Sequence, residues 1–183
     1  MTVEGDSSGS GGRSGSKTQE EDNKTKSNNN QQQNPQPSTS GQSRDDVGKQ
    51  LIDAAQNQDI TKIQTLAKQR NFDPNYEAYG KDTALHKCVK YSKRTKRVEN
   101  ALKCVTFLVE TGGSVDAEDG EGKTPLHWAV LYNDEKMIKQ LIKHGADVLK
   151  EDSQGYHSIS LAIRHDQDLS LRALSENKRV SLV

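Results

Sequence analysis

The segment from Ala117 to Thr124, AEDGEGKT, has residue types and spacing that could hold a nucleotide phosphate. It matches the loose pattern of a phosphate-binding loop, which ends in Gly-Lys-Ser/Thr. Such a loop follows a buried strand and offers bare backbone amides to a polyphosphate. Here residues 112–116 read GGSVD, acidic residues inside the loop would repel a nucleotide, and Pro125 removes a backbone N–H where a helix should begin. We therefore expect no NTP hydrolysis.

Histidines and cysteines are the residues of this chain that could bind a metal. A structural zinc site pairs its ligands two to four residues apart in both halves of the site, and this spacing is absent. Nor does the sequence show a Ser/His/Asp or Cys/His pattern that indicates nucleophilic catalysis. We expect no metal and no cofactor, and reduced core thiols at both cysteines. The residues considered are His86, Cys88, Cys104, His127 and His144.

A cluster of basic residues could bind an import receptor or phosphate groups; its members are Lys93, Arg94, Lys96 and Arg97. It matches a nuclear-import pattern and could also contact phosphates. The alternative is a lysine-rich loop that is simply solvated. We interpret the cluster as a possible import signal or phosphate-contact loop.

The last three residues, Ser181-Leu182-Val183, fit a ligand for PDZ domains. Such domains take an extended carboxy terminus by strand addition. Ser181 and Val183 are thus a possible PDZ ligand, although two fixed positions arise by chance in a few per cent of chains.

Composition limits the classes of partner. Lys plus Arg and Asp plus Glu both number 26, so no global charge attracts the chain to nucleic acid or to an anionic membrane. The N-terminus lacks the pattern of a signal peptide, and no apolar run is long enough to span a membrane. We expect a cytoplasmic and/or nuclear protein without membrane insertion.

Residues 1–46 carry almost no large apolar side chain, which predicts a disordered, low-complexity tail.

The stretch from Asp119 to Val148 has the pattern of a turn followed by two helices. Thr124 is a suitable helix N-cap, and Pro125 suits the first helical position, where its missing N–H costs nothing. Apolar residues recur at helical spacing after Thr124, and again after Asp134, which can cap a second helix. Gly145 supplies the left-handed residue that ends the second helix.

Other segments align with this stretch, so we predict a repeat array over residues 47–183, with atypical repeats at its two ends. The second copy is eight residues longer than the period of about 33, and we place the excess between its helices. The last copy fits a C-terminal cap and equally fits a chain that continues with further repeats. The copies span about 47–77, 78–118 with an inserted basic loop at 91–99, 119–151, and 152–183.

The sequence T-P-L-H at residues 124–127, its variant T-A-L-H at 83–86 and the repeat length resemble the ankyrin repeat family. The resemblance implies an all-α solenoid of about four helix-turn-helix repeats, preceded by the disordered tail. It also implies that His86 and His127 bond to backbone groups between adjacent repeats, and that Trp128 packs there.

Partners of ankyrin-type proteins usually dock on the turn tips and on the exposed faces of the first helices. Large exposed aromatics favour an interface, and four of the five tyrosines fall on this surface, although each could instead lean into a junction between repeats. The residues predicted to bind a partner are Tyr79, Asp82, Tyr91, Glu121, Lys123, Leu131, Tyr132, Tyr156 and Arg164.

The sequence thus predicts a non-catalytic adaptor that works as a monomer, binds a protein rather than nucleic acid, and is not an enzyme. Two alternatives stay open. The chain could be the regulatory N-terminal ankyrin module of a larger protein, such as a palmitoyltransferase or a kinase. It could also be a regulator of a transcription factor, similar to the inhibitors of NF-kappa-B.

Overall fold

The computed structural model describes residues 43–94 and 97–176. Within these ranges the chain is all-helical, as the sequence predicts, and its only extended pairing is an isolated bridge between Glu151 and His157. Most of the predicted tail lies outside the described residues, as do Lys96, Ser181 and Val183. No described helix is both long and apolar enough to cross a membrane.

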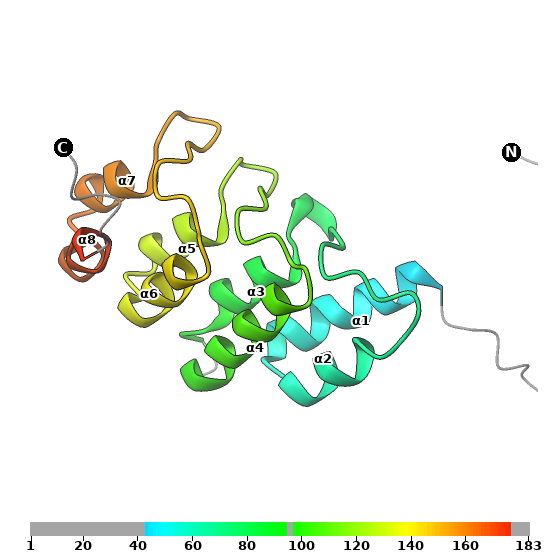
Figure 1. Cartoon of the computed structure of the whole chain (residues 1–183). Coiled ribbons are helices and arrows are strands. Elements are labelled where there is room, and N and C mark those ends of the chain that lie inside the picture. Colours follow the sequence, from blue (N-terminus) through cyan, green and yellow to red (C-terminus); the bar gives the residue numbers. More distant parts are fainter. Residues whose placement is uncertain (1–42, 95–96, 177–183) are drawn as a thin grey trace, which may run out of the picture. The chain divides into compact units, whose positions relative to one another are not determined.

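The helices form two layers, with the first helices of all repeats in one layer and the second helices in the other (Figure 1). Helices α1, α3, α5 and α7 contact one another in sequence, and α2, α4, α6 and α8 do the same. The loops before α3, α5 and α7 project from the same side of the stack, and we call them the finger loops (Figure 1). The helices are α1 (Arg44–Asn57), α2 (Ile60–Leu66), α3 (Ala84–Tyr91), α4 (Val98–Glu110), α5 (Pro125–Leu131), α6 (Glu135–Lys143), α7 (Ser158–Arg164) and α8 (Asp168–Ser175), with a 3-10 turn η1 (Tyr79–Lys81) in the first finger loop.

Local signals in the sequence set the starts of several helices. The Thr124 side chain accepts a hydrogen bond from the His127 amide, and Pro125 occupies the first turn of α5. Asp134 caps α6 by accepting from the Met137 amide. The predicted caps and the left-handed Gly145 are therefore confirmed.

Helix α1 begins before the predicted start of the repeat array at residue 47. Ser43 caps the helix through the Asp46 amide, and two acidic residues in the first turn favour its positive end. Asp45 also accepts a hydrogen bond of 2.5 Å from the Tyr76 hydroxyl. The start of α1 at Arg44 therefore depends on polar contacts, which the pattern of apolar residues in the sequence does not predict.

The excess residues of the second copy are shared between a loop and a helix. Residues 92–97 link α3 to α4, and α4 has 13 residues where α6 has 9. Val98 and Glu99, predicted as loop, form the first turn of α4. Leu102 packs partly buried against the core one turn later, which gives this extension an apolar anchor.

The core lies between the repeats, where equivalent apolar positions are covered by the next helical pair. Val89 and Val130 are 0% exposed. Cys88 and Cys104 are buried free cysteines, as expected. In the fourth repeat Ile163 occupies the position of Val130 and is 65% exposed, so this end of the described stack keeps the apolar residues of an internal repeat.

Candidate functional site

Two histidines join successive repeats through backbone groups. Nδ1 of His86 accepts from the Thr83 amide at 3.2 Å, and Nδ1 of His127 accepts from the Thr124 amide at 3.0 Å. Nε2 is therefore the protonated nitrogen, and it donates to the carbonyl of Lys123 at 2.9 Å from His86. His127 makes the equivalent bond to the Tyr156 carbonyl at 3.1 Å. The bridging role that the resemblance implied is confirmed.

Burial keeps both rings neutral. His86 and His127 are each 0% exposed, and this desolvation lowers the pKa of both imidazoles despite the hydrogen bonds to carbonyls. A neutral ring can accept at one nitrogen and donate at the other, which these two bridges require.

Lys90 lies between aspartates of successive finger loops. Its ammonium contacts Asp82 at 2.6 Å and Asp119 at 3.1 Å, and it lies 4.0 Å from the centre of the Trp128 ring. Trp128 in turn donates from Nε1 to Asp119 at 2.7 Å. We call Asp82, Lys90, Asp119 and Trp128 the Lys90 network.

Asp119 also shapes its own finger loop. Its Oδ1 accepts from the amides of Glu121 and Lys123 at 2.9 and 3.0 Å. Burial favours the neutral carboxyl, but the bonds from Trp128, the Glu121 amide and Lys90 outweigh it and lower the pKa of Asp119. Asp152 holds the next finger loop in the same way, through the amides of Gln154 and Tyr156.

Two residues predicted to contact a partner belong to this buried framework. Asp82 and Lys123 are each 8% exposed. Asp82 pairs with Lys87 and Lys90, and Lys123 reaches Glu121 at 2.9 Å and Asp152 at 3.4 Å. Burial disfavours the charged form of Lys123, but these two carboxylates outweigh it and raise its pKa. Lys123 therefore joins two repeats through Asp152, whereas Asp82 holds Lys90 of its own repeat, which in turn reaches Asp119 of the next. The pattern of a single repeat does not reveal either role.

Four aromatic residues lie on or beside the first helices, and we call Tyr91, Trp128, Tyr132 and Tyr156 the aromatic strip. The rings of Trp128 and Tyr132 are 6.0 Å apart and tilted by 30°, and Tyr132 is 36% exposed. Leu131, beside Tyr132, is half-buried. The hydrogen bond from Trp128 to Asp119 fixes the inner ring, so Tyr132 stacks on a rigid support.

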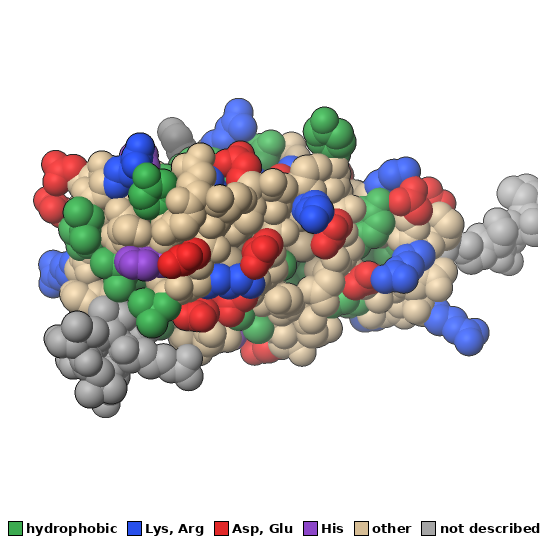
Figure 2. All heavy atoms as spheres, turned by 90° about the horizontal axis from the view of Figure 1, so that it is seen from above, with side chains coloured by type: hydrophobic (Ala, Val, Ile, Leu, Met, Phe, Trp, Pro, Cys, Tyr) green, Lys and Arg blue, Asp and Glu red, His purple; other side chains and the backbone are tan. Residues whose placement is uncertain are grey.

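The remaining predicted contact residues lie around the strip. Tyr79 is fully exposed on the first finger loop, and Glu121 is exposed on the second. Tyr156 lies under the guanidinium of Arg164, whose carbon is 4.9 Å from the ring centre. On the side of the finger loops, basic and acidic side chains are interspersed rather than gathered by sign (Figure 2).

The basic cluster folds back onto the stack instead of projecting from it. Lys93 donates to the carbonyls of Tyr132 and Asn133, the latter at 3.2 Å. The guanidinium of Arg94 lies 5.1 Å from the centre of the Tyr91 ring. Arg97 occupies the N-cap position of α4. The described part of the cluster is thus continuous with the aromatic strip.

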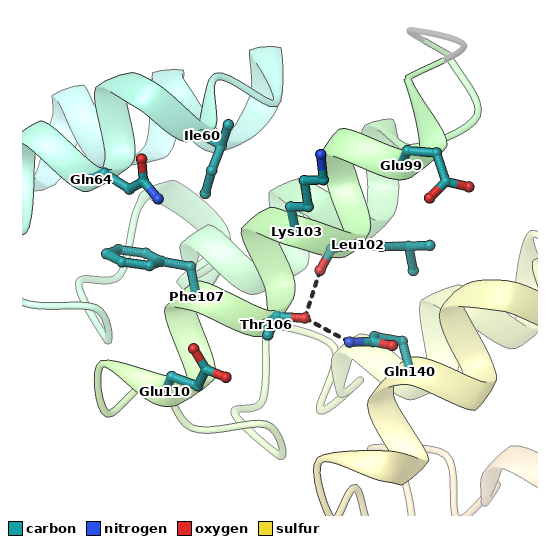
Figure 3. A pocket seen from close by; sticks show the side chains of 9 residues that line it. All are labelled: Ile60, Gln64, Glu99, Leu102, Lys103, Thr106, Phe107, Glu110 and Gln140. Carbon is teal, nitrogen blue, oxygen red and sulfur yellow. Dashed lines mark hydrogen bonds between the residues drawn. The ribbon is translucent and has the colours of Figure 1, made fainter.

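A groove on the second-helix layer was not predicted (Figure 3). It has a volume of about 460 Å³ and lies among α2, α4 and α6. Gln140 donates to Thr106 at 2.6 Å across it, and Phe107 supplies an aromatic side chain. Amphipathic helices predict partly apolar outer positions, but which of them border a groove depends on the packing of three repeats. The other lining residues are Ile60, Gln64, Glu99, Leu102, Lys103 and Glu110.

A family comparison matches this chain to ankyrin repeats, described as three copies, over residues 51–152 and 95–181. Individual relatives match parts of the chain. A human protein, palmitoyltransferase ZDHHC13, is 39% identical over 66 residues, which is 36% of this chain and 11% of the relative. The mouse RelA-associated inhibitor is 32% identical over 98 residues, which is 54% of this chain and 11% of the relative.

A probable serine/threonine-protein kinase of Dictyostelium discoideum is 33% identical over 84 residues, covering 46% of this chain and 9% of the relative. The chain thus spans only about a tenth of the length of these relatives. The similarity is therefore one of repeat regions.

The Lys90 network predicts a large cost for removing its buried carboxylate. We expect Asp119→Ala to lower the free energy of unfolding by about 3 to 5 kcal/mol, because Trp128 and two loop amides lose their acceptor and Lys90 keeps only Asp82. Urea unfolding followed by circular dichroism measures this change. The control is Glu118→Ala, which removes an exposed ion pair with Lys150 and should cost less than about 1 kcal/mol. Equal losses in the two variants would contradict the role of Asp119.

The two bridging histidines predict a loss of stability on acidification. The pKa of each folded ring lies below the ordinary 6.5, so below that pH the unfolded chain binds protons that the folded chain does not. Stability should be fully present above about pH 6.5 and should fall as the pH drops towards the folded-state pKa. Thermal unfolding at about pH 7.5 and about pH 5.5 should give a lower Tm at the acidic pH.

The matched control is the double variant His86→Gln/His127→Gln, in which the side chains at both bridges do not titrate. Its Tm should change less between the two pH values than that of the natural chain. An equal change in both proteins would assign the pH dependence to other groups.

Proposed function

The chain belongs to the ankyrin repeat family, and from this premise we propose that it is a non-catalytic adaptor that binds a protein partner through the aromatic strip. The observation that carries the proposal is Tyr132, a large exposed ring held in place by Trp128 and, through it, by the Lys90 network. Rigid, half-exposed aromatics supply contact area at low entropic cost, which is why they dominate interface hot spots.

The buried charges support recognition rather than catalysis. Asp82, Asp119 and Asp152 all face lysines; the first two bind Lys90 of α3, and Asp152 binds Lys123 of the preceding finger loop. Because these carboxylates and ammonium groups are held in buried ion pairs, they offer no general acid or base to a substrate. We propose that they hold the docking surface in shape, with contacts made by Tyr79, Tyr91, Glu121, Leu131, Tyr132, Tyr156 and Arg164.

A second candidate is a regulatory ankyrin module within a longer polypeptide, and the similarity to repeat regions of a palmitoyltransferase and a kinase favours it. The similarity to the RelA-associated inhibitor favours instead a regulator of a transcription factor. In both cases the same surface would bind the partner. The mass of the cellular polypeptide, compared with 20.2 kDa for this chain, separates a module from a small adaptor.

Tyr132→Ala tests the adaptor proposal. We expect the variant to keep its helical content and to bind its partner about 1 to 2 kcal/mol more weakly, because the ring is exposed and supports no core residue. Affinity purification with the natural chain identifies partners by mass spectrometry, and calorimetry then measures each Kd.

Phe107→Ala is the matched control, since it truncates an aromatic side chain on the second-helix layer. Partners that depend on the aromatic strip should bind this variant as they bind the natural chain. Partners lost equally with both variants, or with neither, would contradict the proposed surface.

We further propose that the protein acts as a monomer in the cytoplasm and/or nucleus, with the basic cluster as an import signal. Replacing Lys93, Arg94, Lys96 and Arg97 together with Ala should then reduce the nuclear fraction of a fluorescent fusion. Lys68→Ala/Arg70→Ala, which removes two exposed basic residues elsewhere, serves as the control. An unchanged nuclear fraction in the fourfold variant would rule out this signal.

A further inference from the structure

We propose that the partner reaches the aromatic strip with an extended acidic segment that carries an apolar residue between two anionic groups. This inference rests on the proposed function and specifies the chemistry of the partner. The apolar residue would contact Leu131 and Tyr132, and the anionic groups would meet cations on the repeats to either side.

The register of the repeats places an apolar centre between basic neighbours. Counting from the cap residues Thr83, Thr124 and His157, the seventh following residue is Lys90 in α3, Leu131 in α5 and Arg164 in α7. The first helices α3, α5 and α7 contact one another in this order. The middle repeat is therefore apolar at this position. Lys90 is held inside the Lys90 network, so the exposed cations on the α3 side are Lys93 and Arg94, which follow it.

The cation on the α3 side is held next to the apolar centre. The Lys93 ammonium donates to the carbonyls of Tyr132 and Asn133, which carry no formal charge. Arg94, the next residue, stacks on Tyr91 at 5.1 Å. Among residues 43–94 and 97–176, no carboxylate forms an ion pair with Lys93 or Arg94. The Lys93 ammonium thus lies beside Tyr132 and the Arg94 guanidinium over Tyr91, and neither is paired with a carboxylate in the described part of the chain.

The cation on the α7 side has the same character. Arg164 donates to the Tyr156 hydroxyl and lies over that ring at 4.9 Å. Within the described part of the chain it also forms no ion pair with a carboxylate. His165, which occupies the position of Tyr132, is exposed beside it. An aromatic ring orients a guanidinium without neutralising it, so the charge stays available to an anion.

The acidic groups of this face are already neutralised or lie away from the apolar centre. Asp82 and Asp119 are buried against Lys87 and Lys90, and they add no net charge to the surface. Exposed Glu121 pairs with Lys123 on the finger loop. Asp166 lies in the turn after α7, beyond Arg164. Asp134 is buried and accepts from the Ser92 hydroxyl and the Met137 amide, so this carboxylate is not presented at the surface. The exposed Lys93, Arg94 and Arg164 therefore give both sides of Leu131 and Tyr132 a positive charge.

The repeat spacing sets the spacing of the ligand. Packed helices lie about 8 to 10 Å apart, and a chain in the extended polyproline II conformation advances about 3.1 Å per residue with about three residues per turn, so side chains three residues apart point to the same side. Anionic groups about three residues before and three residues after the apolar residue would then reach Arg94 and Arg164, in either chain direction. Nucleic acid suits this surface less well, because the cations are few and separated by an apolar centre, and the chain has a net charge of +0.

Selection from a peptide library on the full chain tests the inference. The probe is a library of extended peptides with a fixed central Phe and random flanking positions. We expect the bound pool to be enriched about threefold or more in Asp and Glu about three positions from the Phe. The selected peptides should bind more weakly as salt rises. Paired peptides with phosphoserine or glutamate at the enriched positions show which anion the site prefers, and tighter binding of either supports the inference.

Charge reversal supplies the matched variants. Lys93→Glu/Arg94→Glu should weaken the selected acidic peptides about tenfold or more, and Arg164→Glu should act on the opposite flank. Lys68→Glu/Arg70→Glu makes the same change in charge away from the strip and should leave binding unchanged. Circular dichroism checks the folding of each variant, and Lys93→Gln/Arg94→Gln, which keeps hydrogen-bond donors, should weaken the same peptides to a smaller degree.

Several results would overturn the inference. These are enrichment of Lys and Arg, no positional preference for acidic residues, an equal effect of the control pair, or tight binding of a single-stranded oligonucleotide that the selected peptides do not displace. Selected peptides that depend on Tyr132 but lack acidic positions would refute only the acidic segment. Selected peptides that bind Tyr132→Ala and the natural chain equally would refute the proposed docking surface itself.

Discussion

The packing of one repeat against the next depends most on the Lys90 ammonium, which lies between the carboxylates of Asp82 and Asp119. It joins the first helix of one repeat to the finger loop of the next, at a point where helix packing alone does not determine how the loop lies. Each partner is mostly buried, so replacing Lys90 would leave Asp119 without its cation in a low-dielectric environment. The packing of the two repeats therefore depends on all three side chains.

The bridging histidines add a second constraint of the same kind. Each ring bonds to the cap of its own helix and to a carbonyl one repeat further along, so the start of a helix and the position of the next finger loop are set together. A repeat protein is stabilised mainly by contacts between neighbours. These polar bonds therefore add to the apolar contacts that hold successive repeats together.

The sequence predicted the features that arise within one repeat. Caps such as Thr124, the left-handed Gly145 and the apolar faces of the helices depend on residues a few positions apart, so a single copy reveals them. The burial of Lys123 could not be predicted in this way, because its partner Asp152 belongs to the next repeat. The burial of Asp82 depends on Lys90, which also binds Asp119 of the next repeat. The loop and helix boundaries near Val98 were also missed, since partly buried Leu102 favours the longer α4 only in the context of the stack.

The same framework explains why the strip can present rings and cations together. Trp128 uses its indole N–H on Asp119 and its face on Lys90, so it is held from two directions before Tyr132 packs against it. On this surface Lys93 donates to the carbonyls of Tyr132 and Asn133, and Arg94 stacks on the Tyr91 ring. Asp82 and Asp119 are paired with Lys87 and Lys90, and Asp134 accepts from Ser92 and the Met137 amide, so the outer cations form no ion pair in the described stack. Neutralisation inside the framework thus leaves a positive charge on its surface, although the whole chain has a net charge of +0.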